Sequence, residues 1–392
     1  MRKICIVTST RADFGPLRPL IDEINRRDDL ELQLIVTGTH LAPSFGETVK
    51  EINDYSYPIC KKIEMCIDSD SSTGVGKSMG LLLLSISEAF AELQPDIIVV
   101  LGDRTELIAI VGAAVVHKIP VAHISGGEVT EGAIDDMVRH AITKLSSLHF
   151  TAMEQSSVRL RQMGEEGQRI FTVGELGLDR NNAPALMTRG EFEQFIGVHL
   201  LGKNLLITYH PVTNDDNEPP SQSIEELLVA LNFMDDTLLI FTESNADVGG
   251  QIINRKLREF VKQNPHKSVL FKSLGQRAYT SAMKYVDAVV GNSSSGIWEA
   301  PSFKVPTLNI GSRQKGRVTG EQTLTVECKS EQIASSLVAI YSSAFQEKLV
   351  NVSNPYGDGK SASTVADILR RIDLSEISKA KKFVDYPTKF EM

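Results

Sequence analysis

The segment "PDIIVVLGDRTE" at residues 95–106 decides the fold class of this chain. Its centre, "IIVVL", is a continuous apolar run, and polar residues begin where the run ends. Such runs are typical of parallel strands that are buried on both faces. Outward from this segment, short β-branched runs such as "KICIVTS" at 3–9 alternate with stretches of helical period such as 77–93. The sequence therefore predicts a doubly wound α/β fold.

The alternation of strands and helices is interrupted once. Around 175–203, "LDRNNAPALMTRG" offers turn residues and little periodicity, and the pattern then resumes with "KNLLITYHP". A length of 392 residues also favours two domains. We predict a Rossmann-like domain over 1–175, a second over 176–370, and a helical C-terminal tail over 371–392 that packs back on the first domain. The two domains are expected to face a cleft at the carboxyl ends of their strands, where open α/β sheets bind ligands.

The composition is that of a compact globular protein, with 42% hydrophobic and 23% charged residues. No stretch approaches the roughly eighteen apolar residues of a membrane-spanning helix, and the first apolar run is too short for a signal peptide. The formal net charge of −9 argues against nucleic acid as a partner. The four cysteines form no CxxC pair and have no histidine at zinc spacing, so we expect a cytoplasmic protein without a metal site.

In the first predicted domain, polar residues follow three strands at their carboxyl ends. Arg11 follows the first strand in "TSTRADFGP" and is either an anion contact or a solvated loop cation. Asp103 and Arg104 leave a buried strand side by side, so they must be solvated, paired or functional. Glu128 follows a third strand and is preceded by two glycines. For one of the two acids at 135–136, the acidic first turn of a helix is a sufficient explanation.

The segment "VDAVVGNSSSGIWEAP" at 286–301 predicts an anion site in the second domain. A strand ends at "GN", Ser293 and Ser294 leave room for a phosphate, and a helix with a partially positive end is expected to begin there. Glu299, one turn into that helix, suits the vicinal hydroxyls of a ribose rather than a phosphate. Phosphate and ribose side by side indicate a nucleotide.

Positive charge for a diphosphate is expected nearby. "NIGSRQKGRVTGE" places Arg313, Lys315 and Arg317 just past the next strand. His210 ends a strand of the same domain, so we expect it to contact the ligand. The alternative explanation for this region is a plain strand-to-helix loop with scattered surface bases.

Together these segments carry a family resemblance. The chain resembles the hydrolysing UDP-N-acetylglucosamine 2-epimerases of sialic-acid biosynthesis, in order over roughly 5–320, through "TRADFG", "GDRTE", "GGE" with "IDDMVRHAITKLS", "HPVT", "SNADVGG", "GNSSSGIWEAP" and "GSRQKGRVTGE". The resemblance implies a two-domain fold of the glycosyltransferase-B type in a homo-oligomer, either a dimer or a tetramer. It implies catalytic roles for Asp103 and Asp135, to which we add Glu128 and His210. The implied UDP contacts are Arg11, Arg104, His210, Asn245, Ser293, Ser294, Glu299 and Arg313.

Two departures from the family pattern concern the acids. Many members have a glutamate where this chain has Ser125, directly before "GGE". Either Glu128 or Glu131 takes the role of that carboxylate, or the set of groups that transfer protons differs from that of the family. One extra residue between "GGE" and "IDD" leaves Asp135 and Asp136 as alternatives for the second catalytic acid.

The implied reaction converts UDP-GlcNAc and water into N-acetylmannosamine and UDP through a 2-acetamidoglucal. A carboxylate removes the hydrogen beside the anomeric carbon, and crowding of acids lets one be protonated while another is ionised. The scheme requires no cofactor and no metal, and we expect neither nucleic acid nor a membrane as a partner. One alternative is the same reaction on UDP-2,4-diacetamido-2,4,6-trideoxyglucose, as in legionaminic-type pathways. A second is a UDP-sugar glycosyltransferase, which needs an acceptor site rather than a cluster of acids.

Overall fold

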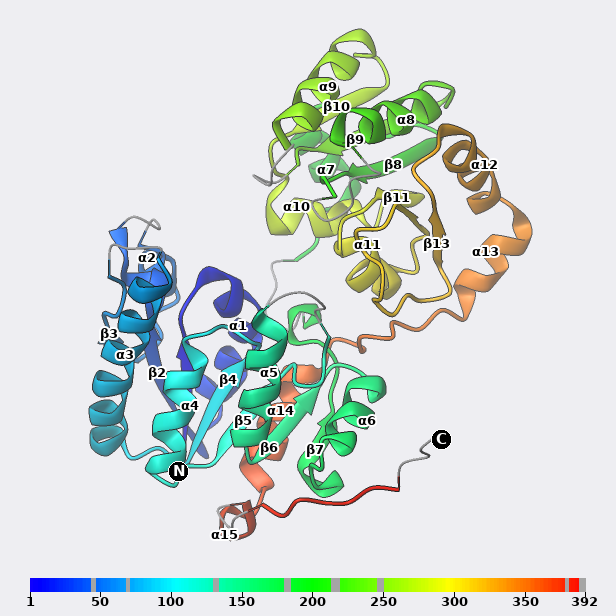
Figure 1. Cartoon of the computed structure of the whole chain (residues 1–392). Coiled ribbons are helices and arrows are strands. Elements are labelled where there is room, and N and C mark those ends of the chain that lie inside the picture. The colour runs from blue at the N-terminus through cyan, green and yellow to red at the C-terminus, as the bar shows by residue number, and fades with distance from the viewer. Residues whose placement is uncertain are drawn as a thin grey trace. The chain divides into compact units, whose positions relative to one another are not determined.

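The chain folds into two compact units (Figure 1). The computed structural model describes residues 1–43, 47–67, 71–129, 134–179, 185–212, 219–244, 250–377 and 381–387. Unit 1 contains Met1–Asn182 and Tyr356–Met392, and unit 2 contains Ala183–Pro355. Of the helices in the described part of the chain, none is long and apolar enough to cross a membrane.

Unit 1 alternates strands and helices, as its sequence predicts. Its strands are β1 (Arg2–Thr8), β2 (Leu30–Thr37), β3 (Ile59–Ile63), β4 (Ile97–Leu101), β5 (Val121–Ile124), β6 (Leu148–Thr151) and β7 (Ile170–Thr172). Its helices are α1 (Arg11–Asn25), α2 (Val49–Asp54), α3 (Ser72–Leu93), α4 (Leu107–Val116), α5 (Ile134–Leu145), α6 (Glu154–Gln162), α14 (Ser361–Arg371) and α15 (Leu374–Ile377). Short 3-10 turns are η1 (Gly38–Leu41), η3 (Gly167–Arg169) and η4 (Leu176–Leu178).

The strands of unit 1 form one parallel sheet in the order β3-β2-β1-β4-β5-β6-β7. Side chains of β1 enter two different cores: Ile4 and Ile6 pack with α1 and α14, whereas Cys5 and Val7 pack with α3 and α4. Successive side chains of a strand point to opposite faces, so a strand covered on both faces needs an apolar residue at every position. This explains the continuous apolar runs of the sequence.

The chain returns to unit 1 after completing unit 2. Helix α14 packs on α1 and places Val365 and Leu369 in the core of the first sheet. The predicted second domain, 176–370, is therefore wrong at both ends, because 176–182 and 356–370 belong to unit 1. Helical periodicity shows that α14 has an apolar face, but it does not show which sheet that face covers.

Unit 2 has the same alternation. Its strands are β8 (Lys203–Thr208), β9 (Thr237–Thr242), β10 (Ser268–Phe271), β11 (Ala288–Gly291), β12 (Thr307–Ile310) and β13 (Thr323–Val326). Its helices are α7 (Arg189–Ile196), α8 (Pro220–Asn232), α9 (Gly250–Gln263), α10 (Gly275–Ala282), α11 (Ser295–Trp298), α12 (Ser330–Ile340) and α13 (Ser343–Val350), with the 3-10 turn η5 (Ala300–Phe303).

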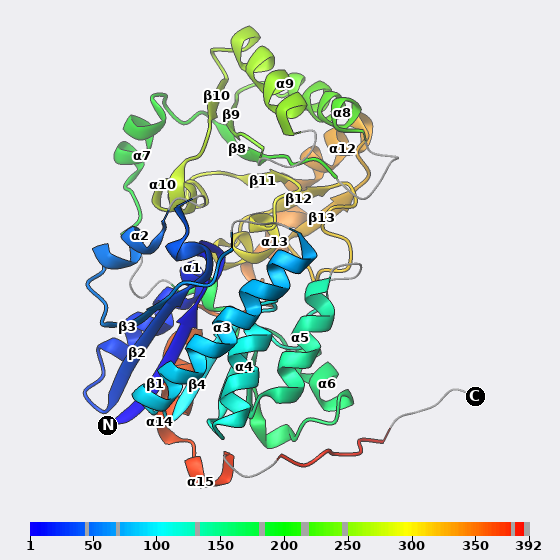
Figure 2. The same cartoon turned by 60° about the vertical axis from the view of Figure 1, so that its left-hand side comes forward.

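The sheet of unit 2 is also parallel, in the order β10-β9-β8-β11-β12-β13. Leu205 and Ile207 of β8 pack with α8, α9 and α12, whereas Leu206 packs on the other face with α7 and α10. Figure 2 shows these two groups of helices on opposite sides of the sheet. The predicted fold class, with two doubly wound Rossmann-like domains, is confirmed.

Candidate functional site

Each sheet has a topological switch point, where two neighbouring strands lead the chain in opposite directions. It lies between β1 and β4 in unit 1 and between β8 and β11 in unit 2. Open α/β sheets bind ligands beside the carboxyl ends of their strands at such points. Arg11, Asp103, Arg104, His210, Ser293 and Ser294 follow these four strands, so the candidate residues of each unit are described around its own switch point.

Arg139 of α5 ties together three predicted acidic segments of unit 1. Its guanidinium forms an ion pair with the Asp103 carboxylate, donates to the Glu128 carbonyl oxygen at 2.9 Å and lies 3.4 Å from the Asp136 carboxylate. The Arg139 side chain is only 4% exposed. A buried cation must be paired, so these contacts hold the loops after β4 and β5 against the first turns of α5. The structure thereby brings Asp103 and Glu128 to the start of α5.

Arg104 and Glu106 form a second charged cluster in unit 1, together with Asp13. Arg104 Nε donates to Glu106 Oε1 at 2.9 Å, and the Ser9 hydroxyl lies 2.7 Å from Glu106 and 2.9 Å from Asp13. Burial opposes ionisation of Glu106, but Arg104 and Ser9 hold its pKa below the usual range. Burial raises the pKa of Asp13 despite several hydrogen bonds to its carboxylate. The two carboxyl groups are thus pushed toward opposite protonation states.

The two acids at the start of α5 differ in their surroundings. Asp136 contacts Arg139, and its other oxygen lies 3.3 Å from His140 Nε2. Burial alone would lower the pKa of Arg104, but neighbouring carboxylates, Asp135 among them, raise it. Asp136 is therefore engaged within its own helix, whereas Asp135 is electrostatically coupled to Arg104.

The turn after β5 is tight. Ser125 has a φ of 65°, in the left-handed region, and its backbone N–H donates to the Phe150 carbonyl oxygen at 2.9 Å. A Cβ on Gly127 would lie 2.5 Å from the Ser156 carbonyl oxygen, so the backbone approaches α6 closely. Glu128 follows this turn and is half-buried. Glu131, the alternative to Glu128, lies outside the described residues.

Arg11 is the first residue of α1, not part of a loop before it as predicted. Thr10 caps the helix: its hydroxyl accepts from the Asp13 backbone N–H at 3.4 Å, and the Asp13 carboxylate accepts from the Thr10 backbone N–H at 3.2 Å. Arg11 Nε lies 3.3 Å from the Glu51 carboxylate, and the Arg11 side chain is 74% exposed. An ion pair so exposed is weak, so it does not hold Arg11 away from an anion.

Asn292, directly after β11, organises the switch point of unit 2. Its Oδ1 accepts from the His210 backbone N–H at 2.7 Å, and its Nδ2 donates to the His210 carbonyl oxygen at 2.8 Å. The Asn292 carbonyl oxygen accepts from Arg313 at 3.2 Å and from Gln314 at 2.8 Å. Asn292 is fully buried. One residue therefore links the loops that follow β8, β11 and β12.

A helix begins at the serines after Asn292, as the sequence predicts: Ser294 is the N-cap residue of α11 and Ser295 its first residue. Helix α11 is only four residues long, so its dipole is small. Instead, the Ser293 hydroxyl accepts from the Ser295 backbone N–H at 3.4 Å and from the Ser295 hydroxyl at 3.1 Å, and Tyr279 contacts Ser295. The polar groups that Ser293 and Ser294 offer to an anion are therefore those of a serine-rich turn.

The remaining predicted residues of unit 2 lie near this turn. Glu299 directly follows α11 and is half-buried. The Arg317 guanidinium carbon lies 4.8 Å from the centroid of the Trp298 ring, and Lys315 is exposed. Arg313 is the predicted base that contacts Asn292. Asn245 lies outside the described residues.

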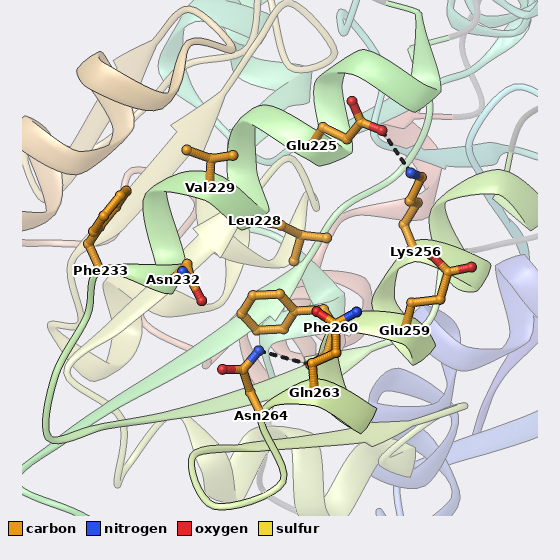
Figure 3. A pocket seen from close by; sticks show the side chains of 10 residues that line it. All are labelled: Glu225, Leu228, Val229, Asn232, Phe233, Lys256, Glu259, Phe260, Gln263 and Asn264. Atoms are coloured by element: carbon orange, nitrogen blue, oxygen red, sulfur yellow. Dashed lines mark hydrogen bonds and ion pairs between the residues drawn. The ribbon is translucent and has the colours of Figure 1, made fainter.

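A groove between α8 and α9 lies elsewhere on unit 2 (Figure 3). Its lining includes Val229, Leu228 and Phe260, and Lys256 pairs with Glu225 across one end at 2.7 Å. The groove contains none of the residues predicted to be functional. Over the described ranges of the chain, no three His, Cys, Asp or Glu side chains come together so that they could hold a metal ion.

Several residues of these clusters are not predicted from the sequence. They are Asp13, Glu106, Arg139 and Asn292. All four lie inside quoted motifs, near residues that are predicted. Arg139 lies one helical turn after the acids at 135–136, which is the spacing of an ion pair along a helix.

Residues 22–370 match the family model of UDP-N-acetylglucosamine 2-epimerase. The chain is 43% identical over 326 residues, 83% of this chain and 84% of the relative, to a GDP/UDP-N,N'-diacetylbacillosamine 2-epimerase (hydrolyzing) of Campylobacter jejuni. It is 36% identical over 377 residues, 95% of this chain and 97% of the relative, to a UDP-N,N'-diacetylbacillosamine 2-epimerase (hydrolyzing) of Legionella pneumophila.

Among solved structures, the UDP-GlcNAc 2-epimerase of Neisseria meningitidis bound to UDP-GlcNAc has a similar fold. The TM-score is 0.76 at 18% identity, over 94% of this chain and 99% of that chain. The family model covers most of the length of both units, and both of the relatives named above exceed 30% identity over most of the chain. The chain belongs to the UDP-N-acetylglucosamine 2-epimerase family.

Proposed function

We propose that this chain is a hydrolysing 2-epimerase, which converts a UDP-linked 2-acetamido sugar and water into UDP and the free sugar epimeric at C2. The observation that carries the proposal is the cluster around Arg139, which joins Asp103, the Glu128 segment and the start of α5. Acidic side chains held in place by a buried cation suit a reaction whose steps are proton transfers.

The first step of this reaction is an elimination. As the bond between the anomeric carbon and the diphosphate oxygen breaks, positive character on the sugar ring acidifies the hydrogen on C2. One of Asp103, Glu128 and Asp135 removes that hydrogen as a proton, and the electron pair of the C2–H bond forms the C1–C2 double bond. UDP leaves with the electron pair of the C1–O bond, so the products are UDP and a 2-acetamidoglucal.

The second step is a hydration. Water adds its oxygen to C1, and C2 receives a proton from the face opposite to the one that lost it, which gives the manno configuration. This step needs one protonated acid and one ionised carboxylate. A cleft with several acids supplies both, because like charges at short range cannot all ionise together.

We assign the UDP moiety to the switch point of unit 2. The turn at Ser293 and Ser294 supplies hydrogen-bond donors for the diphosphate, and Arg313 and His210 stabilise the negative charge that develops as UDP leaves. Glu299 accepts hydrogen bonds from the ribose hydroxyls. In support, Asn292 fixes the segments of His210 and Arg313 together. The remaining proposed UDP contacts are Arg11, Arg104 and Asn245.

We propose UDP-2,4-diacetamido-2,4,6-trideoxyglucose, which is UDP-N,N'-diacetylbacillosamine, as the substrate. Relatives at 43% and 36% identity carry this sugar in their names, which favours it over the UDP-GlcNAc expected from the sequence. UDP-GlcNAc is the second candidate, because the matching family model is described by that sugar. The nucleotide also needs testing, since the Campylobacter relative is named for both GDP and UDP.

The test is proton NMR in deuterated water with each nucleotide sugar in turn. The expected result is release of UDP and a free 2-epimeric sugar with deuterium at C2, faster from the diacetamido substrate than from UDP-GlcNAc. GDP-linked diacetamido sugar is the control for the nucleobase. Binding of all three compounds without turnover contradicts the proposal. Transfer of the sugar to an added acceptor, with the C2 hydrogen retained, indicates a glycosyltransferase.

A further inference from the structure

The C-terminal segment 381–387 forms a strap across unit 1 (Figure 1, red, beyond α15). The sequence predicts a helical tail over 371–392; α15 is helical, whereas the described residues of the strap are not. The Val384 backbone N–H donates to the Gly164 carbonyl oxygen at 3.0 Å. Tyr386 OH donates to the Glu165 carbonyl oxygen at 3.1 Å and accepts from the Gly167 backbone N–H at 3.0 Å. The strap is thus tied to the loop after α6.

The strap also completes a buried charge cluster around Glu165. Lys381 Nζ lies 2.7 Å from Glu165 Oε2, Lys144 Nζ lies 2.6 Å from Glu165 Oε1, and His149 Nε2 lies 3.0 Å from Oε2. The Glu165 side chain is fully buried. Burial alone would raise the pKa of Glu165, but its three partners lower it to about 2. The carboxylate therefore anchors Lys381.

Lys381 at the same time caps the end of α5. Its ammonium donates to the carbonyl oxygens of Thr143 at 3.0 Å and Ser146 at 2.8 Å. The last carbonyl groups of a helix lack partners within the helix and carry partial negative charge, so a cation placed there stabilises the end of the helix. This helix carries Asp135 in its first turn and Arg139 one turn later.

Two contacts lead from α5 to the loop of Asp103. The Thr143 hydroxyl lies 3.3 Å from His123 Nδ1, and His123 Nε2 lies 2.8 Å from the Gly102 carbonyl oxygen. A carbonyl oxygen can only accept, so Nε2 carries the hydrogen and Nδ1 accepts from Thr143. The second contact is the ion pair between Arg139 and Asp103. Displacement of α5 would therefore move the Asp103 loop at two points.

We infer that Lys381 is a positioning residue: by capping α5 and bridging it to Glu165, the C-terminal strap holds Asp103 and the start of α5 in the arrangement that the reaction requires. The inference rests on the proposed function for its kinetic consequence, but its structural consequence can be measured without any substrate. Lys381 belongs to none of the clusters around Arg139, Arg104 and Asn292, so it acts through α5 and not on the sugar.

The test uses the full-length chain with Lys381→Met, which removes the charge and keeps most of the side-chain volume. The control is Lys382→Met at the adjacent, exposed lysine. Hydrogen–deuterium exchange is compared over 134–146 and over 102–106 without substrate, and UDP affinity is measured by calorimetry. In Lys381→Met, exchange should rise at least about fivefold in both segments. UDP affinity should stay within about twofold of the wild type, because, of the proposed UDP contacts, only Arg104 lies in a loosened segment, and those assigned to unit 2 are untouched.

With the sugar that the enzyme turns over, Lys381→Met should lower kcat about tenfold and leave KM within about twofold, since small displacements of catalytic groups cost rate rather than binding. The control should match the wild type. Unchanged exchange over 102–106, or an unchanged kcat, overturns the inference. A parallel loss of kcat, UDP affinity and melting temperature also overturns it, because that pattern indicates general unfolding. If the wild type turns over neither sugar, the proposed function fails, and the exchange over 102–106 alone decides the positioning role.

Discussion

Glu175 should make the stability of unit 1 depend on pH around neutrality. Glu175 directly precedes η4. Its side-chain Oε1 accepts from the Gly177 backbone N–H at 3.5 Å, and its backbone N–H donates to the Tyr356 carbonyl oxygen at 2.6 Å. Burial, and then the charge of Glu128, raise the pKa of Glu175 to about 7. We predict that Glu175→Gln, which is neutral at every pH, stabilises the protein above neutrality.

The size and sign follow from proton linkage. A carboxyl group whose pKa lies near 7 in the folded chain, against an ordinary 4.5, holds its proton more tightly when folded. Unfolding then releases that proton between these two values, so the stability of the wild type falls as the pH rises from about 4.5 to about 7. At 1.36 kcal/mol per pKa unit, the full difference is about 3 kcal/mol. For a unit of this size it corresponds to roughly 6 to 12 °C in melting temperature.

The assay is thermal unfolding of wild type and Glu175→Gln from pH 4.5 to pH 8.5, followed by circular dichroism. The two proteins should melt together at the acid end and diverge as the pH rises, with the variant more stable. Glu64→Gln replaces an exposed carboxyl group of the same unit and serves as the control. A constant difference between Glu175→Gln and wild type at all pH values would refute the reasoning, because only a titrating group gives a difference that grows with pH.

Three further predictions concern single positions. Asp103→Asn should lower turnover at least about a hundredfold while UDP affinity measured by calorimetry stays nearly intact; a large loss of UDP binding would make Asp103 structural. Gly291→Ala should destabilise unit 2 by about 3 kcal/mol in thermal melts, since its φ is 127° and its Cβ would lie 2.0 Å from the Thr208 carbonyl oxygen. Gly197→Ala, with a φ of 75° but no atom within 4 Å, should cost only about 1 kcal/mol and is the matched control. The pKa of Glu165 is lowered to about 2, so its ionised carboxylate should stabilise the folded chain above about pH 4.5 and lose this effect as the pH falls toward 2. The melting temperatures of Glu165→Gln and wild type should therefore differ near neutral pH and converge in acid.

The inner strands of both sheets are predictable because strands buried on both faces carry continuous apolar runs, as β4 and β9 do. The edge strands β3 and β13 are only partly buried, and they are not predicted from the sequence. The return of the chain to unit 1 is not predictable in this way. Helix α14 is amphipathic and would suit either sheet. Its place depends on contacts distant in sequence, such as the Ser361 backbone N–H that donates to the Asp179 carboxylate at 2.9 Å. Local patterns carry no information about such a pair.

The candidate site is predictable at the level of strand ends, since parallel strands direct their carboxyl ends to one edge. Arg139 escapes prediction because a charged residue in a helical pattern is expected on the exposed face, whereas its side chain is 4% exposed. The end of α11 before Glu299, which the sequence places one turn into the helix, has a different reason. Pro301 lies three residues after Trp298, the last residue of α11. A proline has no backbone N–H to continue the α-helical hydrogen bonds, and it disfavours α-helical geometry in the residue before it.

The two units share one strand order, yet the chemistry at their switch points differs. In unit 1, the carboxylates near Arg104 and Arg139 outnumber these two cations, so a diphosphate alone would meet net repulsion there. In unit 2, Arg313 donates to the carbonyl oxygen of the buried Asn292, and serines directly follow Asn292 in the sequence. Under the proposed function, the acid and base come from Asp103, Glu128 and Asp135 of unit 1, whereas His210 and Glu299 of unit 2 contact the UDP moiety. Under the proposed function, substitutions in the Asn292 cluster should therefore raise KM, whereas those around Arg139 should lower kcat. The two units share a topology, so this difference comes from the side chains that each unit places at its switch point.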